Sequence, residues 1–392
     1  HRLAKVTSQT DGKTTGTANP RGSAMKKIPL IKPFINEEVK AKVCEVLDSG
    51  YLTEGPVTRA FEEKFKDYIG CGYALAVTSC TTGLEMALRA LGIGSGDEVI
   101  VPDYTYPATA DVINIVGAKI VIVDVSKDTM LIDYDKMEKA ITRSTRAIIP
   151  VSGFGNPLDY DHLSRIKEKY GVYLIEDAAC SIGAEYRGIK VGNQADISVF
   201  SLHPRKFITT GEGGMITTAN GKWADWMMSY KHFGMGVEGS RLTNRFERVG
   251  SNYKLSNILA AVGMVQMQHI HELLDRRLAL SGNYLTLLKD HPEIVIPETT
   301  ARGKHSRQSF CIYIKGRDEV IPKMADLGIE VQIGTYALHL HPAFAPSARC
   351  RITDALPEST YAFEHCLTLP LYHELTEEDQ AYVVENLLQS LP

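Results

Sequence analysis

The stretch SLHPRKFITTGEGG, residues 201–214, decides how we interpret the chain. It overlaps the alternating apolar run DISVFSL, residues 196–202, which is typical of a strand that ends at a site. Lys206 follows among Ser and Thr hydroxyls and glycine amides that suit an anion. A lysine that forms a Schiff base needs such a place, because its amine attacks a carbonyl only after losing a proton. The alternative is a surface loop in which Arg205 and Lys206 are merely solvated.

Length and composition narrow the class of protein. The chain has 392 residues, enough for a large core and more than one domain. A formal net charge of −4 argues against nucleic acid or a membrane surface as the main partner. Seven scattered cysteines without a CxxC pair indicate reduced thiols, no metal site and a cytoplasmic protein. No apolar run is long enough to span a membrane, and we expect residues 1–24 to be an added or disordered tail.

Strands and helices alternate through the first half of the chain. Short apolar runs predict buried strands at residues 73–78, 97–102, 119–124, 147–151 and 172–177, with helical patterns at 36–47, 57–68, 84–91 and 160–170. Such alternation predicts an α/β fold with a mostly parallel sheet. Sites in these sheets lie at the carboxyl ends of strands. The segments that fall there are Thr78–Thr82, Tyr104–Tyr106, Asp177 and Ser201–Lys206.

The pattern changes after residue 225. The polar loop GSNYKLSN, residues 250–257, precedes what we predict to be one long helix from Ile258 to about Leu288. Short strands and helices follow it. We therefore predict a large domain over residues 25–265, with helices on both faces of the sheet, and a smaller C-terminal α+β domain over residues 266–392.

Three features at the strand ends have a structural and a functional interpretation. The turn SCTTG, residues 79–83, offers backbone amides at a helix N-terminus, which suits a phosphate, yet Thr81 and Thr82 are also ordinary N-cap residues. Asp177 would cap the next turn or pair with an arginine, or near Lys206 it would keep a pyridine nitrogen protonated. Tyr106 would stack on such a ring or be a core tyrosine.

Seven stretches together resemble the DegT/DnrJ/StrS family of pyridoxal-phosphate-dependent sugar aminotransferases, within the fold-type-I group. They are SGYLTEGP, TSCTTGLEMAL, VPDYTYPAT, IEDAACSIGA, SVFSLHPRKFITTGEGGMITT, GSNYKLSNILAAVG and LPLYHELTEEDQ, in the family's order. The resemblance covers the chain from Met25 onward. It implies the fold of a fold-type-I transferase, a large αβα domain followed by a small domain, with pyridoxal 5'-phosphate as the cofactor.

The resemblance also implies roles for individual residues. Lys206 matches the lysine that binds the cofactor covalently and later shuttles a proton, and Asp177 matches the acid paired with the pyridine nitrogen. The other matches to cofactor-binding positions are Cys80, Thr81, Tyr106, Cys180, Ser201 and Asn252. Asn252 matches an asparagine that reaches the phosphate of the neighbouring subunit, which implies a homodimer with shared active sites. Thr53 and His339 match the substrate side, and no metal is implied.

Two positions depart from the family's pattern. Cys180 stands where relatives often carry Gln, His or Glu near the phenolic oxygen of the cofactor. The turn VSGFG, residues 151–155, replaces a histidine-containing turn that is common among relatives. Both departures bear on the substrate and leave the cofactor unaffected.

The activity implied is transfer of an amino group from an amino acid, expected to be glutamate, to a nucleotide-linked keto sugar. The first choice is a 4-keto-6-deoxy sugar, in amino-sugar and polysaccharide biosynthesis. Because one lysine acts as base and acid in turn, we expect the pKa of its amine to be depressed. Two alternatives stay open, an aminotransferase for a 3-keto sugar or cyclitol ketone and a non-catalytic regulatory relative that binds the cofactor. Intact Lys206 and Asp177 argue against the non-catalytic relative.

Overall fold

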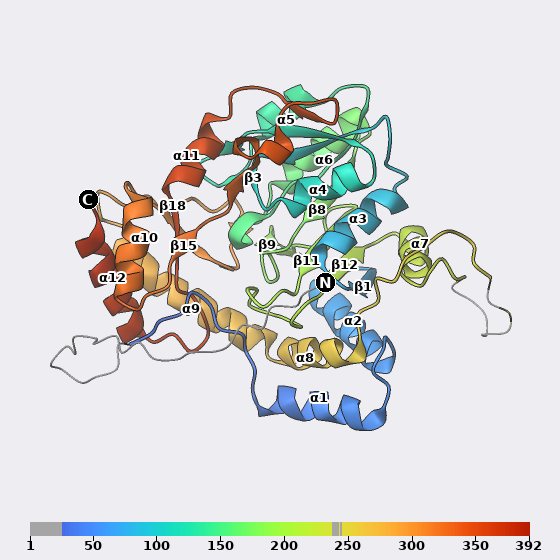
Figure 1. Cartoon of the computed structure of the whole chain (residues 1–392), viewed down its shortest axis with the longest axis horizontal. Coiled ribbons are helices and arrows are strands. Elements are labelled where there is room, and N and C mark those ends of the chain that lie inside the picture. The colour runs from blue at the N-terminus through green and yellow to red at the C-terminus, as the bar shows by residue number, and fades with distance from the viewer. Residues whose placement is uncertain (1–25, 237–242, 244) are drawn as a thin grey trace, which may run out of the picture.

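An eight-stranded sheet forms the centre of the computed structural model, which describes residues 26–236, 243 and 245–392 (Figure 1). The expected tail over residues 1–24 lies outside these described residues. In spatial order the strands are β1 (Tyr73–Val77), β12 (Gly214–Thr218), β11 (Ile197–Ser201), β8 (Tyr173–Asp177), β7 (Thr145–Ile148), β2 (Glu98–Pro102), β4 (Lys119–Val123) and β17 (Cys350–Ile352). Every neighbouring pair is parallel except those of β12, which runs antiparallel to both β1 and β11. The predicted α/β class is confirmed.

Helices cover both faces of this sheet, so its strands are buried on two sides. The helices before the C-terminal segment are α1 (Glu37–Ser49), α2 (Pro56–Ile69), α3 (Cys80–Ala90), α4 (Ala108–Ile115), α5 (Tyr134–Ala140), α6 (Tyr160–Tyr170), α7 (Gly221–Lys231) and α8 (Asn257–Gln268). Buried side chains of α2, α5, α6 and α8 share one apolar core with the sheet, and those of α3, α4 and α7 share the other. Burial on both faces explains why the strands are continuous apolar runs.

The C-terminal segment builds a separate apolar core and also returns to the large sheet. Its elements are α9 (Ile270–Leu288), β14 (Phe310–Tyr313), α10 (Arg317–Asp326), β15 (Gln332–Ile333), α11 (Pro357–His365), β18 (Cys366–Leu369) and α12 (Glu377–Ser390). Strands β14, β18 and β15 form an antiparallel sheet that packs with α9, α10 and α12 (Figure 1). Because β17 pairs with β4, this segment also extends the large sheet. The domain division at residue 266 stays a prediction.

Short elements complete the part of the chain that is described. The short strands are β3 (Tyr104–Thr105), β5 (Val125–Ser126), β6 (Leu131–Ile132), β9 (Glu185–Tyr186), β10 (Ile189–Lys190), β13 (Gly303–Lys304) and β16 (Tyr336–Ala337). Single 3-10 turns lie at η1 (Gly153–Gly155), η2 (Leu338–Leu340) and η3 (Pro342–Phe344). Within the described ranges, no helix combines the length and the apolar character that crossing a membrane would require.

The prediction of one long helix from Ile258 to Leu288 is wrong, because the helix is interrupted at His269. Helix α8 ends at Gln268 and α9 begins at Ile270, while His269 has φ −97° and ψ 8° and its N–H donates to the carbonyl of Gln266 at 3.1 Å. The ring Nε2 of His269 lies 2.7 Å from Glu38 Oε2, on α1. The helix is thus interrupted at a residue that makes a tertiary contact, and the apolar periodicity of the sequence did not predict this interruption.

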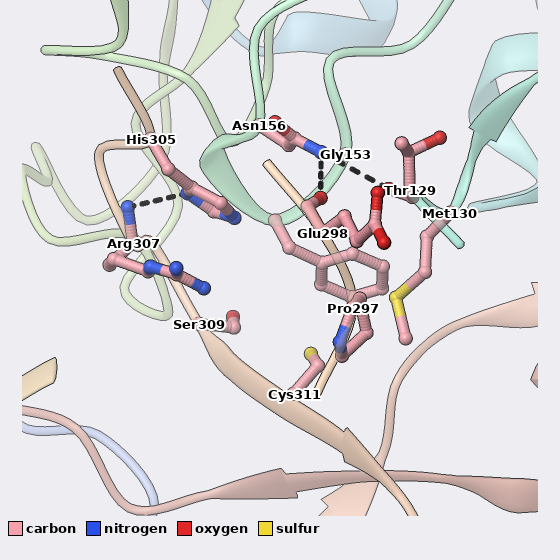
Figure 2. Close-up of a pocket in the computed structure, with 11 residues that line it drawn as sticks. Thr129, Met130, Gly153, Asn156, Pro297, Glu298, His305, Arg307, Ser309 and Cys311 are labelled. Atoms are coloured by element: carbon pink, nitrogen blue, oxygen red, sulfur yellow. Dashed lines mark hydrogen bonds between the residues drawn. The ribbon is translucent and has the colours of Figure 1, made fainter. Parts of the chain in front are cut away.

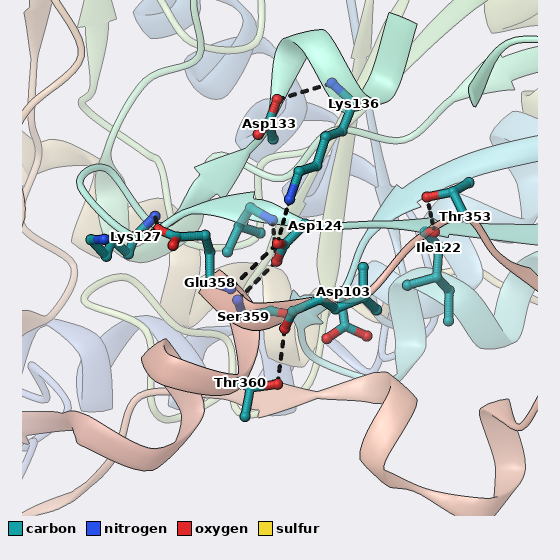
Figure 3. A network of polar contacts seen from close by, with 12 residues as sticks. Asp103, Ile122, Asp124, Lys127, Asp133, Lys136, Thr353, Glu358, Ser359 and Thr360 are labelled. Atoms are coloured by element: carbon teal, nitrogen blue, oxygen red, sulfur yellow. Dashed lines mark hydrogen bonds and ion pairs between the residues drawn. The ribbon is translucent and has the colours of Figure 1, made fainter. Parts of the chain in front are cut away.

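The buried carboxylate of Asp124 joins the C-terminal segment to the large sheet (Figure 3). Asp124 follows β4, and its Oδ1 accepts from the N–H groups of Val125 at 3.0 Å and Ser359 at 2.8 Å. Its Oδ2 accepts from Lys136 Nζ at 2.7 Å and from the N–H of Glu358 at 3.3 Å. Asp124 therefore binds the N-terminus of α11 and the side chain of an α5 lysine together. Burial raises the pKa of Asp124, but these donors outweigh it and hold the pKa below its ordinary value.

We expect Asp124→Asn to lower the free energy of unfolding at pH 7 by about 2 to 3 kcal/mol, because it removes one partner of a buried ion pair. A depressed pKa contributes stability above the unfolded value of about 3.9, and that contribution is lost as the pH falls through the folded value. The deficit of the variant should therefore stay nearly constant from about pH 7 to about pH 5 and shrink as the pH falls further, from about 4 to about 2.5. Urea denaturation across this range measures it.

Asp135→Asn is the matched control, because Asp135 is an exposed residue of α5. It should change stability by no more than about 0.5 kcal/mol. Equal effects of the two substitutions, or a deficit at Asp124 that does not depend on pH, would contradict the role given to Asp124.

Candidate active site

A cavity of about 860 Å³ opens at the carboxyl ends of the central strands. Its walls come from residues 104–106 after β2, from the ends of β8 and β11, from the N-terminus of α3, and from C-terminal residues 308–309, 332–335, 368–369 and 371. Seven of the predicted site residues line it, namely Cys80, Thr81, Tyr106, Asp177, Cys180, Ser201 and Lys206. The convergence expected of strand ends in a parallel sheet is therefore present.

Register explains why these segments meet. In the sheet, Gly214 of β12 pairs with Val77 at the end of β1 and with Ser201 at the end of β11. A Cβ atom on Gly214 would lie 2.6 Å from the carbonyl oxygen of Ser79 and 2.7 Å from the amide nitrogen of Cys80. Only glycine allows β12 to lie this close to the turn that begins α3.

The N-terminus of α3 has the properties of an anion site. Ser79 Oγ accepts from the N–H of Thr82 at 3.1 Å, and Thr82 Oγ1 accepts from the N–H of Ser79 at 3.1 Å, which forms a capping box. Thr82 is thus a capping residue, which was the structural interpretation of this turn. Among the described residues, no hydrogen bond uses the Thr81 hydroxyl or the N–H groups of Cys80 and Thr81. These donors remain available to a phosphate.

Asp177 lies at the end of β8 with only 5% of its surface exposed. Its Oδ2 accepts from Thr109 Oγ1 at 2.7 Å, and its Oδ1 accepts from the N–H of Ala179 at 3.1 Å. Thr109 Oγ1 also lies 2.9 Å from Thr105 Oγ1. Burial raises the pKa of Asp177; these hydrogen bonds and the charge of Lys206 lower it less, so the pKa stays above its ordinary value. No arginine of the described residues pairs with Asp177, and the cavity holds a carboxylate whose charge is only partly compensated.

Lys206 reaches into the cavity from the loop after β11. Its Nζ donates to Cys180 Sγ at 2.9 Å, and its backbone N–H donates to the carbonyl of His203 at 2.8 Å. The alternative of a merely solvated Lys206 is therefore wrong. Burial lowers the pKa of the amine, but the sulfurs of Cys180 and Cys80 and the carboxylate of Asp177 raise it above its ordinary value. The expected depression of the Lys206 pKa is wrong for the chain by itself, because the contacts with Cys180 and Cys80 and the carboxylate of Asp177 outweigh the burial of the amine.

The remaining predicted residues divide between the cavity and other places. Tyr106 is 66% exposed and faces the cavity, with its ring centroid 6.3 Å from that of Tyr336, so the alternative of a core tyrosine is wrong. Thr53 and Asn252 are exposed and lie outside the lining of the cavity, and so does His339. Their roles stay predictions.

The ring of His339 is engaged by a buried acid. Its Nδ1 lies 2.6 Å from Asp103 Oδ2, and its backbone N–H donates to Asp103 Oδ1 at 2.8 Å. Asp103 is fully buried after β2. This pair joins the C-terminal segment to the large sheet, much as Asp124 does.

A second, smaller pocket adjoins the cavity and shares Gly153, Phe154 and Ser309 with it (Figure 2). Its volume is only about 10 Å³. In it Asn156 Nδ2 donates to the carbonyl of Glu298 at 3.0 Å, and the N–H of Arg307 donates to His305 Nδ1 at 2.9 Å. A space of this size holds at most one water, so the large cavity is the candidate site. No group of acids, cysteines and histidines in the described part of the chain is suited to a metal ion.

The cavity has the donors that pyridoxal phosphate requires. An amine at Lys206 matches its aldehyde, the carboxylate of Asp177 matches its ring nitrogen, and the amides of α3 with Thr81 and Ser201 match its phosphate. Sequence reasoning missed Thr109, which orients Asp177, although its spacing of four residues from Thr105 within TYPAT was visible. It also missed Gln308, for which the sequence carries no signal.

Comparison with known proteins agrees with this geometry. The DegT/DnrJ/EryC1/StrS aminotransferase family matches residues 33–388. The protein MJ1066 of Methanocaldococcus jannaschii is 34% identical over 371 residues, which cover 91% of this chain and 96% of that protein.

Two solved structures of bacterial proteins are also similar. The putative sugar aminotransferase Spr1654 from Streptococcus pneumoniae in its PMP form has a TM-score of 0.86 at 29% identity, covering 93% of this chain and 99% of that one. DesV from S. venezuelae has a TM-score of 0.84 at 31% identity, covering 93% and 98%.

These findings confirm the expected enzyme class and cofactor. Spr1654 has also been solved in a PLP form, and the family depends on this cofactor. The alternative of a non-catalytic cofactor-binding relative has no support in them. The match spans nearly all of the described chain, and the residues in the cavity are those that the chemistry needs. The chain therefore belongs to the DegT/DnrJ/EryC1/StrS aminotransferase family and is a pyridoxal-phosphate-dependent aminotransferase.

Proposed function

We propose that the enzyme moves the amino group of L-glutamate to the keto group of a nucleotide-linked sugar, with a 4-keto-6-deoxy sugar as the first candidate. The observation that carries the proposal is the single cavity in which Lys206, Asp177 and the N-terminus of α3 meet. Its volume of about 860 Å³ exceeds what the cofactor alone would fill. Spr1654, which is described as a putative sugar aminotransferase and is similar over nearly its whole length, supports a sugar as the acceptor.

Each residue of the cavity has a task in this chemistry. Pyridoxal phosphate, when bound, supplies an electron sink that allows the Cα–H bond of the donor to break. Lys206 Nζ would hold the cofactor and then carry the proton, and Asp177 would keep the ring nitrogen protonated. Thr81, Ser201 and the free amides of α3 would hold the phosphate. Cys180 lies against the amine of Lys206 and is placed to influence its protonation.

Arg205 supports an anionic substrate. Its guanidinium is exposed at the cavity and donates to the amide oxygen of Gln332 at 2.9 Å. No carboxylate of the described residues pairs with it. A carboxylate of glutamate, or a phosphate of the nucleotide, would supply the missing charge.

Exposed apolar side chains support a homodimer with shared active sites. Tyr51 and Leu52 are exposed next to Thr53, and Phe233 is exposed where its N–H donates to the carbonyl of Ser251, beside Asn252. Covering these side chains in a dimer would bring Thr53 and Asn252 to the cavity of the partner. This arrangement accounts for their distance from the cavity of their own chain.

We expect a kcat/KM for a nucleotide-linked 4-keto-6-deoxy sugar that exceeds the values for 3-keto sugars and cyclitol ketones at least about tenfold, a difference of about 1.4 kcal/mol. Assays with glutamate as the donor and a panel of these ketones measure it. A preference for a 3-keto sugar or a cyclitol ketone would overturn the acceptor and leave the enzyme class intact.

We expect Lys206→Ala to lower kcat more than about 10³-fold, because the same amine binds the cofactor and moves the proton. The visible absorption of the wild-type holoenzyme should change on adding glutamate, and that of the variant should not. Lys222→Ala, which removes an exposed lysine of α7, is the control and should behave as the wild type. Turnover that survives in Lys206→Ala would refute the assignment.

Asp177→Asn should lower kcat by about 10²- to 10³-fold. It should also remove the free-energy cost of burying an ionised carboxylate in the cofactor-free protein. Because burial raises the pKa of Asp177, its ionised form destabilises the fold; the cost is absent below the unfolded value of about 3.9 and grows as the pH rises through the folded value. The melting temperature of the cofactor-free variant, relative to cofactor-free wild type, should therefore rise from pH 4 to pH 7. A difference that stays constant with pH would argue against this account.

A further inference from the structure

Gln308 contacts both peptide groups that flank the catalytic lysine. Its side-chain Nε2 donates to the carbonyl of Arg205 at 2.9 Å, and its Oε1 accepts from the N–H of Phe207 at 3.1 Å. The residue precedes β14, belongs to the C-terminal segment, and is 5% exposed at the wall of the cavity. The side-chain amide of Gln308 thus hydrogen-bonds to the backbone on both sides of Lys206. If the side-chain amide were rotated by 180°, its NH2 group would face the N–H of Phe207 and its oxygen would face the carbonyl of Arg205. The two peptide groups therefore fix the orientation of the amide.

The backbone of Gln308 is itself held. Arg277 of α9 is buried, and its guanidinium donates to the carbonyls of Gln308 at 2.9 Å and of Arg307 and Leu371 at 3.3 Å each. The same guanidinium lies 5.2 Å from the ring centroid of Phe207. Burial lowers the pKa of Arg277 to about 9. Arg277 therefore joins the support of Gln308 to the residue that follows Lys206.

Apolar packing holds the loop just after Lys206, since Phe207 and Ile208 lie in the core, but the backbone next to the lysine has few hydrogen bonds. Residues 203–213 contain no helix or strand, although the N–H of Lys206 donates to the carbonyl of His203 at 2.8 Å. Among the described residues, the carbonyl of Arg205 and the N–H of Phe207 have no hydrogen-bond partner besides Gln308. Without Gln308, both peptide groups would lose their partner, and the backbone on either side of Lys206 would be less strictly fixed.

We propose that Gln308 is a positioning residue, which fixes the backbone of Lys206 and through it the place of the amine opposite Cys180. The proposal depends on the proposed function at one point only, the chemical role of Lys206. A displacement of about 1 Å at a reacting group costs on the order of 10²-fold in rate. A merely structural glutamine would instead affect stability and leave the rates unchanged.

The chain offers a matched control in Gln266. This glutamine is fully buried on α8; its Oε1 accepts from the N–H of Thr209 at 2.8 Å, and its Nε2 donates to the carbonyl of Phe34 at 2.7 Å. It therefore has the same side chain, a similar burial and a bond to the same loop as Gln308. Neither of its bonds involves a peptide group next to Lys206.

The test compares Gln308→Leu, Gln308→Glu and Gln266→Leu with the wild type. The first readout is the rate constant with which cofactor-free protein captures pyridoxal phosphate covalently, followed by its absorbance, and it needs no turnover. The second is the rate at which the holoenzyme reacts with glutamate, and the third is the melting temperature. Gln308→Leu should slow both rates about 10- to 100-fold. Gln308→Glu, which keeps the acceptor for Phe207 and loses the donor for Arg205, should slow them less.

Gln266→Leu should lower the melting temperature at least as much as Gln308→Leu while both rates stay within about threefold of the wild type. The proposal is overturned if Gln308→Leu changes only the melting temperature, or if the rates of all variants follow their stability. Should Gln308→Leu fail to fold, Gln308→Glu and Gln308→Met decide by the same criterion. A wild type that captures the cofactor but aminates no keto sugar would refute the proposed function alone.

Discussion

The site depends on the close contact between Gly214 and the turn that begins α3. Because Gly214 pairs with both Val77 and Ser201, the strand ends that deliver the anion site and the lysine loop lie on either side of one residue. A side chain there would collide with the backbone of Ser79 and Cys80. Moving β12 away to make room would separate the amides of α3 from Lys206. The antiparallel strand, which interrupts an otherwise parallel sheet, therefore brings the two halves of the cofactor site together.

The cavity also concentrates charge that the fold does not neutralise. Burial raises the pKa of Asp177, and the sulfur of Cys180 helps to raise that of Lys206. The ionised carboxylate of Asp177 is therefore costly to the protein without its cofactor, whereas the raised pKa of Lys206 means that the site stabilises its protonated amine. The positive ring nitrogen of the cofactor would complement Asp177, and its phosphate would complement the free amides of α3. The site is thus built for a ligand at the expense of the stability of the empty fold.

The C-terminal segment takes part in the site through polar contacts to the large sheet. Asp124 binds the N-terminus of α11, Asp103 binds His339, and Gln308 contacts the loop of Lys206. Each contact places a buried polar group of one segment against donors or acceptors of the other, where misalignment would leave it unsatisfied. Such contacts fix orientation more strictly than apolar packing does. They explain how two segments with separate apolar cores form one cavity wall.

The sequence by itself determined the fold class and the polar residues at the strand ends that line the cavity, and the resemblance carried by its motifs indicated the enzyme class. Continuous apolar runs that alternate with helical patterns specify a parallel sheet, and the polar residues just after each run must gather at one edge, as Asp177, Ser201 and Lys206 do. The tertiary structure alone decided the rest. The break at His269, the direction of the pKa of Lys206 and the position of Gln308 all depend on residues brought close from distant parts of the chain. Periodicity and local spacing report on neighbours in the sequence, whereas burial, charge and hydrogen bonding depend on neighbours in space.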